Sequence, residues 1–147
     1  VAGLVAITPC AGFVGGLSPI IIGGVAGAVC YLAIWLKFHF KFDDSLDVIA
    51  VHLVGGIIGS VLLGFFADSA VNKLGKDGVF FGGGWSLVGE QVLAVVVIMA
   101  FSMVVTLIIG LGLKKSLSKG IRVTSEEEEI GLDLTQHSEN AYSLERV

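Results

Sequence analysis

Charged residues are scarce in this sequence, at 15% of 147 positions, and three long stretches contain none at all. Soluble domains carry about 25% charged residues, so the composition excludes an ordinary soluble protein. The uncharged stretches are residues 1–36, 48–67 and 91–113. Because a helix of about 20 apolar residues crosses a bilayer core, they predict three complete membrane spans and part of a fourth. The expected fold class is an all-α membrane protein, a polytopic transmembrane helix bundle.

The motifs of several enzyme classes are also missing. The sequence has no P-loop, no GxSxG, no HExxH and no cluster of histidine and cysteine, and nothing in it suggests nucleic-acid binding. Cys10 and Cys30 lie in apolar runs without CxxC spacing, which indicates small buried hydrophobic residues. Asp43, Asp44 and Asp47 are conceivable metal ligands, but helix capping already explains two of them. We therefore expect no enzymatic activity, no cofactor and no metal site.

Turns and polar loops set the expected topology. We expect an incomplete span over residues 1–14, kinked at Pro9, and complete spans over 18–36, 48–67 and about 85–113. Lysine and arginine are enriched on the cytoplasmic side of membrane proteins. The loop 37–45 and the segment 114–122 share one side and hold six of these residues, against two in the loop 68–84. This predicts a multi-pass protein of the cell membrane with a cytoplasmic C-terminus.

The C-terminal tail differs in composition from the spans. Residues 123–147 hold seven acidic side chains and one arginine. We divide the chain into a transmembrane domain over residues 1–122 and a cytoplasmic acidic tail over 123–147. Charge runs of this kind usually form solvated segments with little fixed structure. The apolar residues Ile130, Leu132 and Leu134 between the charges favour the alternative, a regulatory or partner-binding tail.

Glycine is abundant, with 21 residues, most of them in or near apolar segments. GxxxG spacing occurs at Gly12–Gly16, Gly23–Gly27 and Gly55–Gly59, and Gly56, Ser60 and Gly64 form a second ladder on the second complete span. Small residues at this spacing let helix backbones approach closely in lipid. The pattern predicts tightly packed helices rather than a simple membrane anchor.

One ionisable residue, His52, lies inside the second complete span. At about 100° per residue it shares a face with Gly55 and Gly59, whereas Ala50 and Val54 lie on the opposite face, which suits lipid. We therefore expect His52 to point into protein. Ionisable residues inside membranes are costly and usually functional. A neutral imidazole can relay a proton or bind a small polar solute; the alternative is a packing histidine bonded to a backbone carbonyl.

Two acidic residues precede this span. Asp44 is placed to cap the helix, and Asp47 lies three residues on, in the expected first turn. Carboxylates there meet exposed N–H groups and the positive end of the helix dipole. Asp47 is about 140° from His52 around the helix, so we expect no direct pair between them.

Four segments of the sequence carry a family resemblance. They are "AGLVAITPCAGFV" (2–14), "DDSLDVIAVHLVGGIIG" (43–59), "GIRV" (120–123) and "EEEIGLDLTQHSENAYS" (127–143). On these segments the chain resembles ammonium transporters of the ammonium transporter/Rhesus type over essentially its whole length. The tail favours the bacterial, archaeal or plant branch. The chain looks like roughly the last third of such a transporter, which agrees with a start at Val1 inside apolar sequence, and we expect a C-terminal fragment.

The resemblance implies a fold of eleven helices, of which this chain holds the last three to four, and a homotrimer with one pore per subunit. In the family two histidines stack in a narrow apolar pore and assist the passage of ammonia and a proton. His52 resembles the second of that pair, and Asp47 the acid at the helix start. Val48 matches a position lining the cytoplasmic end of the pore, and Thr8 a position near the pore. The regulatory tail of the family matches here at Gly120, Arg122, Asp133, Asn140 and Tyr142; it contacts neighbouring subunits and often receives a PII-type regulator.

The sequence departs from the family pattern at Leu53, where a glycine usually follows the histidine; this puts the pore shape in doubt. The first histidine, the outer ammonium site and the aromatic gate are expected upstream of Val1, so we expect no transport by this chain alone. Two alternatives to transport stay open. One is a membrane-embedded ammonium sensor that signals through its tail, and the other is an apolar anchor for a soluble tail.

Overall fold

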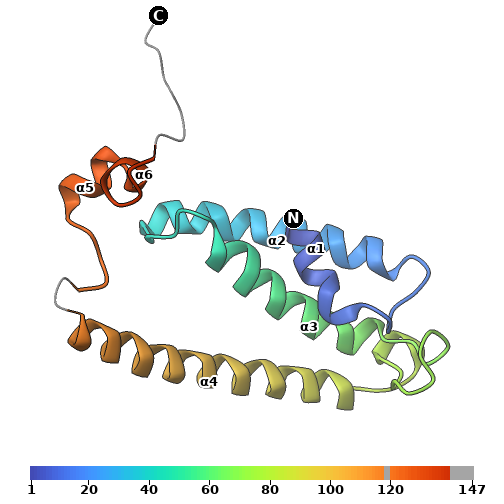
Figure 1. The fold of residues 1–147 in the computed structure, drawn as a ribbon. Coiled ribbons are helices and arrows are strands. Elements are labelled where there is room, and N and C mark those ends of the chain that lie inside the picture. The colour runs from blue at the N-terminus through green and yellow to red at the C-terminus, as the bar shows by residue number, and fades with distance from the viewer. Residues whose placement is uncertain (118–119, 140–147) are drawn as a thin grey trace, which may run out of the picture. The chain divides into compact units, whose positions relative to one another are not determined.

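The computed structural model describes residues 1–117 and 120–139. Its regular elements are α1 (Ala2–Ile7), η1 (Thr8–Cys10), α2 (Ser18–Phe40), η2 (Val48–Leu53), α3 (Val54–Phe66), η3 (Val79–Phe81), α4 (Ser86–Ser116), α5 (Ser125–Ile130) and α6 (Leu132–Thr135) (Figure 1). No strand occurs within these described residues. Three helices, Ser18–Phe40, Val48–Phe66 and Ser86–Ser116, are long and apolar enough to cross a membrane. The expected all-α membrane fold, a partial helix bundle, is confirmed.

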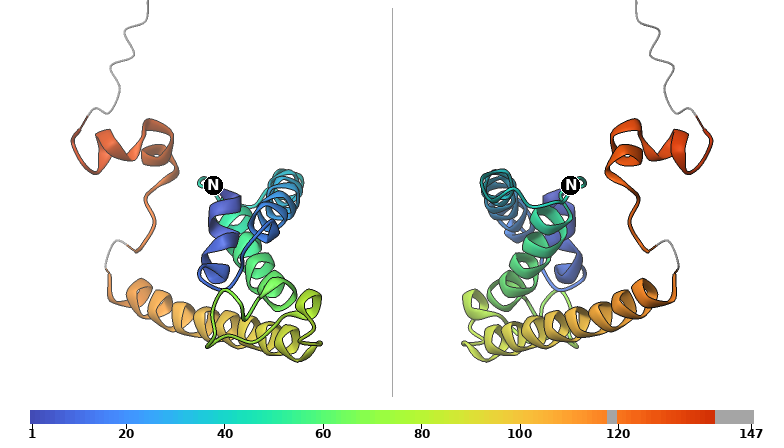
Figure 2. Two further views of the ribbon diagram at one scale, coloured as in Figure 1. Left: turned by 90° about the vertical axis from the view of Figure 1, so that its right-hand side faces the viewer. Right: turned by 90° about the vertical axis from the view of Figure 1, so that its left-hand side faces the viewer.

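The chain divides into two compact units, Val1–Ala100 and Phe101–Val147. In the first unit α1 packs against both α2 and α3, which Figure 2 shows as the blue, cyan and green group of helices. Its core consists of small and branched apolar side chains, namely Ala6, Cys10, Ile22 and Ala26, surrounded by Ile7, Val14, Ile58, Leu62, Leu63 and Phe66. Cys10 and Cys30 are both buried, as predicted for small hydrophobic residues.

Close backbone contact between α1 and α3 depends on glycine. A Cβ atom built on Gly59 would lie 2.1 Å from the carbonyl oxygen of Ala6, far inside the contact limit, and one on Gly55 would lie 3.4 Å from the Cys30 Sγ. The Cys10 thiol donates to the Gly59 carbonyl oxygen at 3.3 Å. The GxxxG pair of the second complete span therefore packs as predicted.

Other glycines behave differently from the prediction. Gly12 and Gly16 have φ values of +81° and +57°, so they belong to the turn between η1 and α2 and form no helix-packing pair. A Cβ on Gly27 or Gly56 would meet nothing within 4 Å in the described part of the chain, whereas one on Gly64 would lie 2.7 Å from the Val88 Cα. Of the glycines expected to pack against another helix, Gly55, Gly59 and Gly64 therefore do so in the described residues, whereas Gly27 and Gly56 do not.

The first complete span is one turn longer than predicted, because α2 ends at Phe40 and not at Leu36. Lys41 follows in the left-handed conformation, with φ 54°, and the Phe42 N–H donates to the Lys37 carbonyl oxygen at 3.2 Å. This arrangement is a helix C-cap, here formed without glycine. Lys37 was placed in a polar loop by its charge, but its side chain is buried and lies on the helix.

The connection between α3 and α4 is tied together by its backbone. The Asp68 N–H donates to the Phe13 carbonyl oxygen at 2.9 Å, and the Gly78 N–H donates to the Ala67 carbonyl oxygen at 2.8 Å. The Asp77 carboxylate accepts from the Ser69 N–H at 2.7 Å, and this bond lowers the pKa of Asp77. The glycine-rich sequence thus forms an ordered loop before the third complete span.

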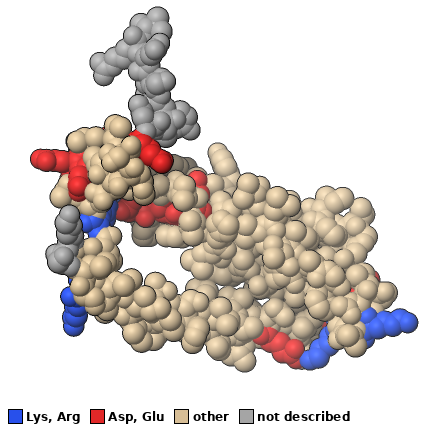
Figure 3. All heavy atoms as spheres, in the orientation of Figure 1, with Lys and Arg blue, Asp and Glu red and all other residues tan. Residues whose placement is uncertain are grey.

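Helix α4 is apolar on all sides and none of its described residues is buried. Such a helix suits a membrane span, since only lipid or other protein can cover its whole surface. On the face drawn in Figure 3, most of the surface is tan, and the charged residues form a few small groups.

The acidic tail contains two short helices, so the expectation of little fixed structure is wrong for α5 and α6. Thr124 begins α5 with a capping box: the Glu127 N–H donates to the Thr124 Oγ1 at 3.3 Å, and the Thr124 N–H donates to the Glu127 carboxylate at 2.9 Å. The Gln136 amide donates to Glu127 at 3.0 Å, which joins the end of α6 to α5.

Candidate functional site

The second complete span begins with a π-helix, η2, which carries both Val48 and His52. A π-helix closes i→i+5 hydrogen bonds, is rare, and is frequently found at functional sites. Because each turn takes in more residues than an α-turn, side chains of Val48–Leu53 do not follow a spacing of 100° per residue. The helix continues as a regular α-helix from Val54.

The π-helix changes the faces that the sequence predicted. Ala50, expected to face lipid, is buried at 1% exposure, whereas Gly55 and Gly59 are buried as expected. The His52 side chain is exposed, so the prediction that it shares the packed glycine face is wrong within the described residues. No hydrogen bond of its imidazole to a backbone carbonyl occurs in the part of the chain that the structure describes.

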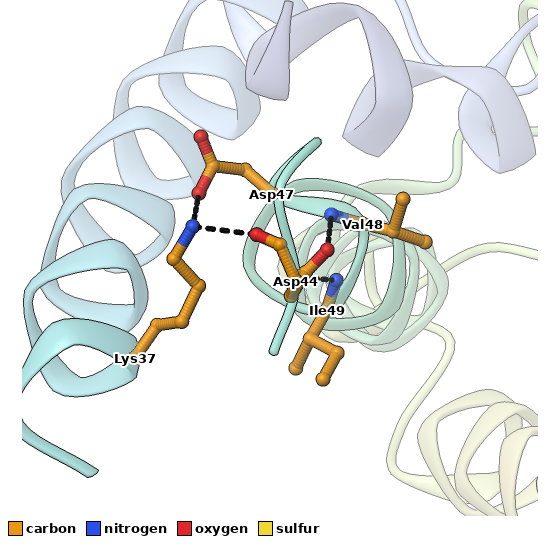
Figure 4. Close-up of polar contacts among 5 residues, drawn as sticks. All are labelled: Lys37, Asp44, Asp47, Val48 and Ile49. Atoms are coloured by element: carbon orange, nitrogen blue, oxygen red, sulfur yellow. Dashed lines mark hydrogen bonds and ion pairs between the residues drawn. The ribbon is translucent and has the colours of Figure 1, made fainter. Parts of the chain in front are cut away.

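Asp44 caps the π-helix, as predicted, with both oxygens of its carboxylate. Its Oδ1 accepts from the Val48 N–H at 2.9 Å and its Oδ2 accepts from the Ile49 N–H at 2.8 Å (Figure 4). These N–H groups belong to the first turn and have no partner inside the helix. The cap therefore fixes the start of the segment that carries His52.

Asp47 lies immediately before the helix and not in its first turn. Its backbone is left-handed, with φ 56° and ψ 31°, and its carboxylate forms an ion pair with Lys37 from the end of α2. Lys37 Nζ also donates to the Asp44 carbonyl oxygen at 2.8 Å. Figure 4 shows Lys37 reaching from its helix to both aspartates. No hydrogen bond or ion pair joins Asp47 to His52 in the described residues.

Thr8 lies in η1, where its hydroxyl donates to the Leu4 carbonyl oxygen at 2.8 Å. No hydrogen bond links Thr8 to His52 among the described residues. Leu53, the departure from the family pattern, is 42% exposed and lies outside the core.

In the second unit, three of the five predicted tail residues are described. Gly120 has a left-handed backbone with φ 75°, Arg122 forms an ion pair with Glu128 at 3.2 Å, and the Asp133 carbonyl accepts from the Glu139 N–H at 2.8 Å. Gly120 and Arg122 also line an open hollow together with Thr124, Glu127 and Gln136. Asn140 and Tyr142 lie outside the described residues.

A metal site is not found in the part of the chain that the structure describes. Within residues 1–117 and 120–139, no group of three or more His, Cys, Asp or Glu side chains is placed to hold a metal ion.

Sequence reasoning missed Lys37 as a member of this site. A signal was present: Lys37 lies ten residues before Asp47, next to a sequence with no other charge for 36 residues before it. A cation at the end of an apolar helix needs an acidic partner if it is buried. The two short helices of the tail were also missed, although Thr124 and Glu127 have the spacing of a capping box.

Comparison with known proteins decides the family. The model of the Ammonium Transporter Family matches residues 1–142. The chain belongs to the ammonium transporter family. An ammonium transporter of Bacillus subtilis is 46% identical over 144 residues, covering 97% of this chain and 35% of the relative. The ammonium transporter Amt1 of Archaeoglobus fulgidus is 47% identical over 143 residues, again covering 97% of this chain and 35% of the relative.

The fold agrees with this family. The crystal structure of Saccharomyces cerevisiae Mep2 matches with a TM-score of 0.76 and 37% identity, over 85% of this chain and 29% of Mep2. The Candida albicans Mep2 structure matches with a TM-score of 0.75 and 35% identity, over 86% of this chain and 28% of that protein. This ammonium transporter chain thus spans about a third of the length of its relatives, and the resemblance seen in its sequence is confirmed.

Proposed function

We propose that this chain acts, within a complete subunit, in the transport of ammonium across the cell membrane. The observation that carries the proposal is the family match along residues 1–142, supported by relatives named ammonium transporters that are 46% and 47% identical to it. Three helices suited to membrane spans supply the required setting. Members of this family are transporters and not enzymes.

His52 is proposed as the polar group of the transport path in this chain, the second histidine of the pair implied by the family resemblance. Its side chain is exposed on the π-helix and has no hydrogen-bond partner among the described residues. A neutral imidazole has one donor and one acceptor, so it can bind ammonia or pass on a proton. An ammonium ion loses its hydration in an apolar path, and a hydrogen-bonding side chain lowers that cost.

Val48 and Thr8 complete the proposed path on this chain. Val48 begins the π-helix and is 49% exposed, so its apolar side chain is available to line a lumen. We place Val48 toward the cytoplasm, because lysine and arginine are more frequent on the side that includes the loop after α2 and the segment after α4. In this orientation the N-terminal end of α3 is the cytoplasmic end of the path.

The tail over residues 123–147 is proposed as a regulatory segment. The capping box and the Gln136–Glu127 hydrogen bond give residues 124–136 defined local structure, and a hollow next to them presents Gly120 and Arg122. We propose that the tail contacts neighbouring subunits of a homotrimer and receives a PII-type regulator. Exposed Ile130, Leu132 and Leu134, at 61%, 45% and 50%, give it apolar surface for such contacts.

The test uses the full-length parent transporter, reconstituted in liposomes, with the internal pH or the current recorded after an ammonium pulse. We expect a response from the parent protein and a change in its rate or its selectivity over methylammonium in His52→Ala. The matched control is Leu32→Ala, an exposed position on α2 outside the proposed path, which should leave both rate and selectivity unchanged.

Two outcomes contradict parts of the proposal. A folded parent trimer without any ammonium response contradicts transport. If that protein still binds ammonium, the sensor function that signals through the tail is supported instead. An ammonium response that His52→Ala leaves unchanged makes His52 a packing residue, with transport retained.

A further inference from the structure

The side chain of Lys37 ends in a buried junction between α2 and the start of the π-helix. Its Nζ forms an ion pair with the Asp47 carboxylate and donates to the Asp44 carbonyl oxygen at 2.8 Å (Figure 4). The side chains of Lys37 and Asp47 are 8% and 36% exposed, whereas those of Lys76 and Glu90 are 65% and 49% exposed. Removing Asp47 is costly because it leaves the buried Lys37 charge uncompensated, while an exposed pair contributes little.

Both partners of Lys37 also hold the π-helix directly. The Asp44 carboxylate accepts from the Val48 and Ile49 N–H groups, and the Asp47 carbonyl oxygen accepts from the Val51 N–H at 2.8 Å. Lys37 therefore contacts one residue that caps the π-helix and one that directly precedes it. A single cation on α2 sets the point and direction at which the next helix starts.

The backbone of Asp47 adds a second reason for this tether. A left-handed conformation, here φ 56°, costs free energy for a residue with a side chain, although less for aspartate than for most others, and surrounding contacts stabilise it. The ion pair to Lys37 is such a contact. The left-handed residue lies directly before the π-helix, so its conformation determines how the following turn is oriented.

We propose that Lys37 is a positioning residue for transport, acting through Asp47 and Asp44 to fix the π-helix that carries Val48 and His52. Its role is indirect and involves no contact with the transported species. The inference rests on the proposed function of His52. Displacing a functional group by about 1 Å can change rates by roughly 10²-fold, so loss of the tether should be visible in transport itself.

The experiment compares four variants of the full-length transporter: Lys37→Met, Asp47→Asn, the double variant, and Lys76→Met as the matched control at an exposed pair. Thermal unfolding in detergent and the ratio of ammonium to methylammonium flux in liposomes are measured for each. We expect Lys37→Met to change the flux ratio several-fold, and Lys76→Met to keep the wild-type ratio. Asp47→Asn should lower thermal stability, because it leaves the buried Lys37 charge unpaired.

The double variant separates positioning from stability. It removes both charges, so we expect it to regain stability lost in Asp47→Asn while its flux ratio stays altered, because the tether is still absent. Recovery of stability and flux ratio together would show that the pair only supports folding, and would overturn the proposal. A Lys37→Met ratio equal to that of the wild type would overturn it as well.

A readout independent of transport distinguishes failure of this inference from failure of the proposed function. If the wild-type protein shows no flux, the proposed function has failed, and amide hydrogen exchange at Val48 and Ile49 tests the tether alone. Faster exchange in Lys37→Met than in Lys76→Met supports positioning of the π-helix by Lys37. Equal exchange in the two variants overturns it.

Discussion

Gly59 of α3 and Ala6 of α1 pack backbone against backbone, so closely that a Cβ on Gly59 would lie 2.1 Å from the Ala6 carbonyl oxygen. The carbonyl oxygen of Gly59 also accepts a hydrogen bond from the Cys10 thiol. The contact joins the short N-terminal helix to the span that carries the proposed transport histidine, and it places a strict limit on side-chain size.

Gly59→Ala is expected to destabilise the protein, because the added methyl group meets main-chain atoms that cannot rotate away. Overpacking a well-packed interior costs about 1–3 kcal/mol. Thermal unfolding of the full-length protein in detergent measures the loss. Gly56→Ala is the control, since a Cβ there meets nothing within 4 Å in the described chain. Equal unfolding temperatures for the two variants would contradict the close contact.

Asp44→Ala is expected to loosen the start of the π-helix, since the Val48 and Ile49 N–H groups both lose their acceptor. Removing an N-cap side chain typically costs about 0.5–2 kcal/mol. Asp44→Asn keeps one acceptor oxygen and should have a smaller effect. Amide exchange at Val48 and Ile49, measured with thermal unfolding, checks the order wild type, Asn, Ala. An alanine variant that exchanges like the wild type would show that the cap is dispensable.

Asp77 is expected to contribute pH-dependent stability to the loop before α4. Its pKa is lowered, chiefly by the hydrogen bond from the Ser69 N–H, so the folded state favours the ionised carboxylate. The stabilisation is fully present above the unfolded pKa of about 4 and is lost as the pH falls through the lower folded pKa. Thermal unfolding of wild type and Asp77→Asn between pH 7 and pH 3 measures it. The two proteins should converge at the acidic end, and a constant difference would assign the effect to another group.

The spans were predictable from the sequence because their signal is simple. A long uncharged stretch has few alternatives to a membrane helix, so the spans that begin near Ser18, Val48 and Ser86 appear where expected. The cap by Asp44 and the contact of Gly59 were equally accessible, because each follows from residue type and position in a helix. The position of His52 inside an apolar span already indicated a proton relay or a contact for a polar solute, and the family resemblance added its expected place as the second histidine of a pair.

The π-helix and the burial of Lys37 were not predictable from the sequence, because both depend on backbone geometry that residue type does not determine. The π-helix inserts extra residues into a turn, and nothing in the letters 48–53 distinguishes it from an α-helix, so the predicted face of Ala50 was wrong. Lys37 was interpreted as a loop residue because of its charge, although the carboxylate of Asp47 pairs with it and allows its side chain to be buried on the helix.

The burial of both thiols has a practical consequence for spectroscopic labelling. Cys10 and Cys30 are 0% and 1% exposed, so neither offers a maleimide or spin-label reagent an accessible sulfur. Among residues 1–147, a cysteine introduced at an exposed position such as Ser125 would then carry the probe almost alone. Motion of the acidic tail can thus be followed without replacing Cys10 or Cys30, a change that would disturb the packing around Gly55 and Gly59.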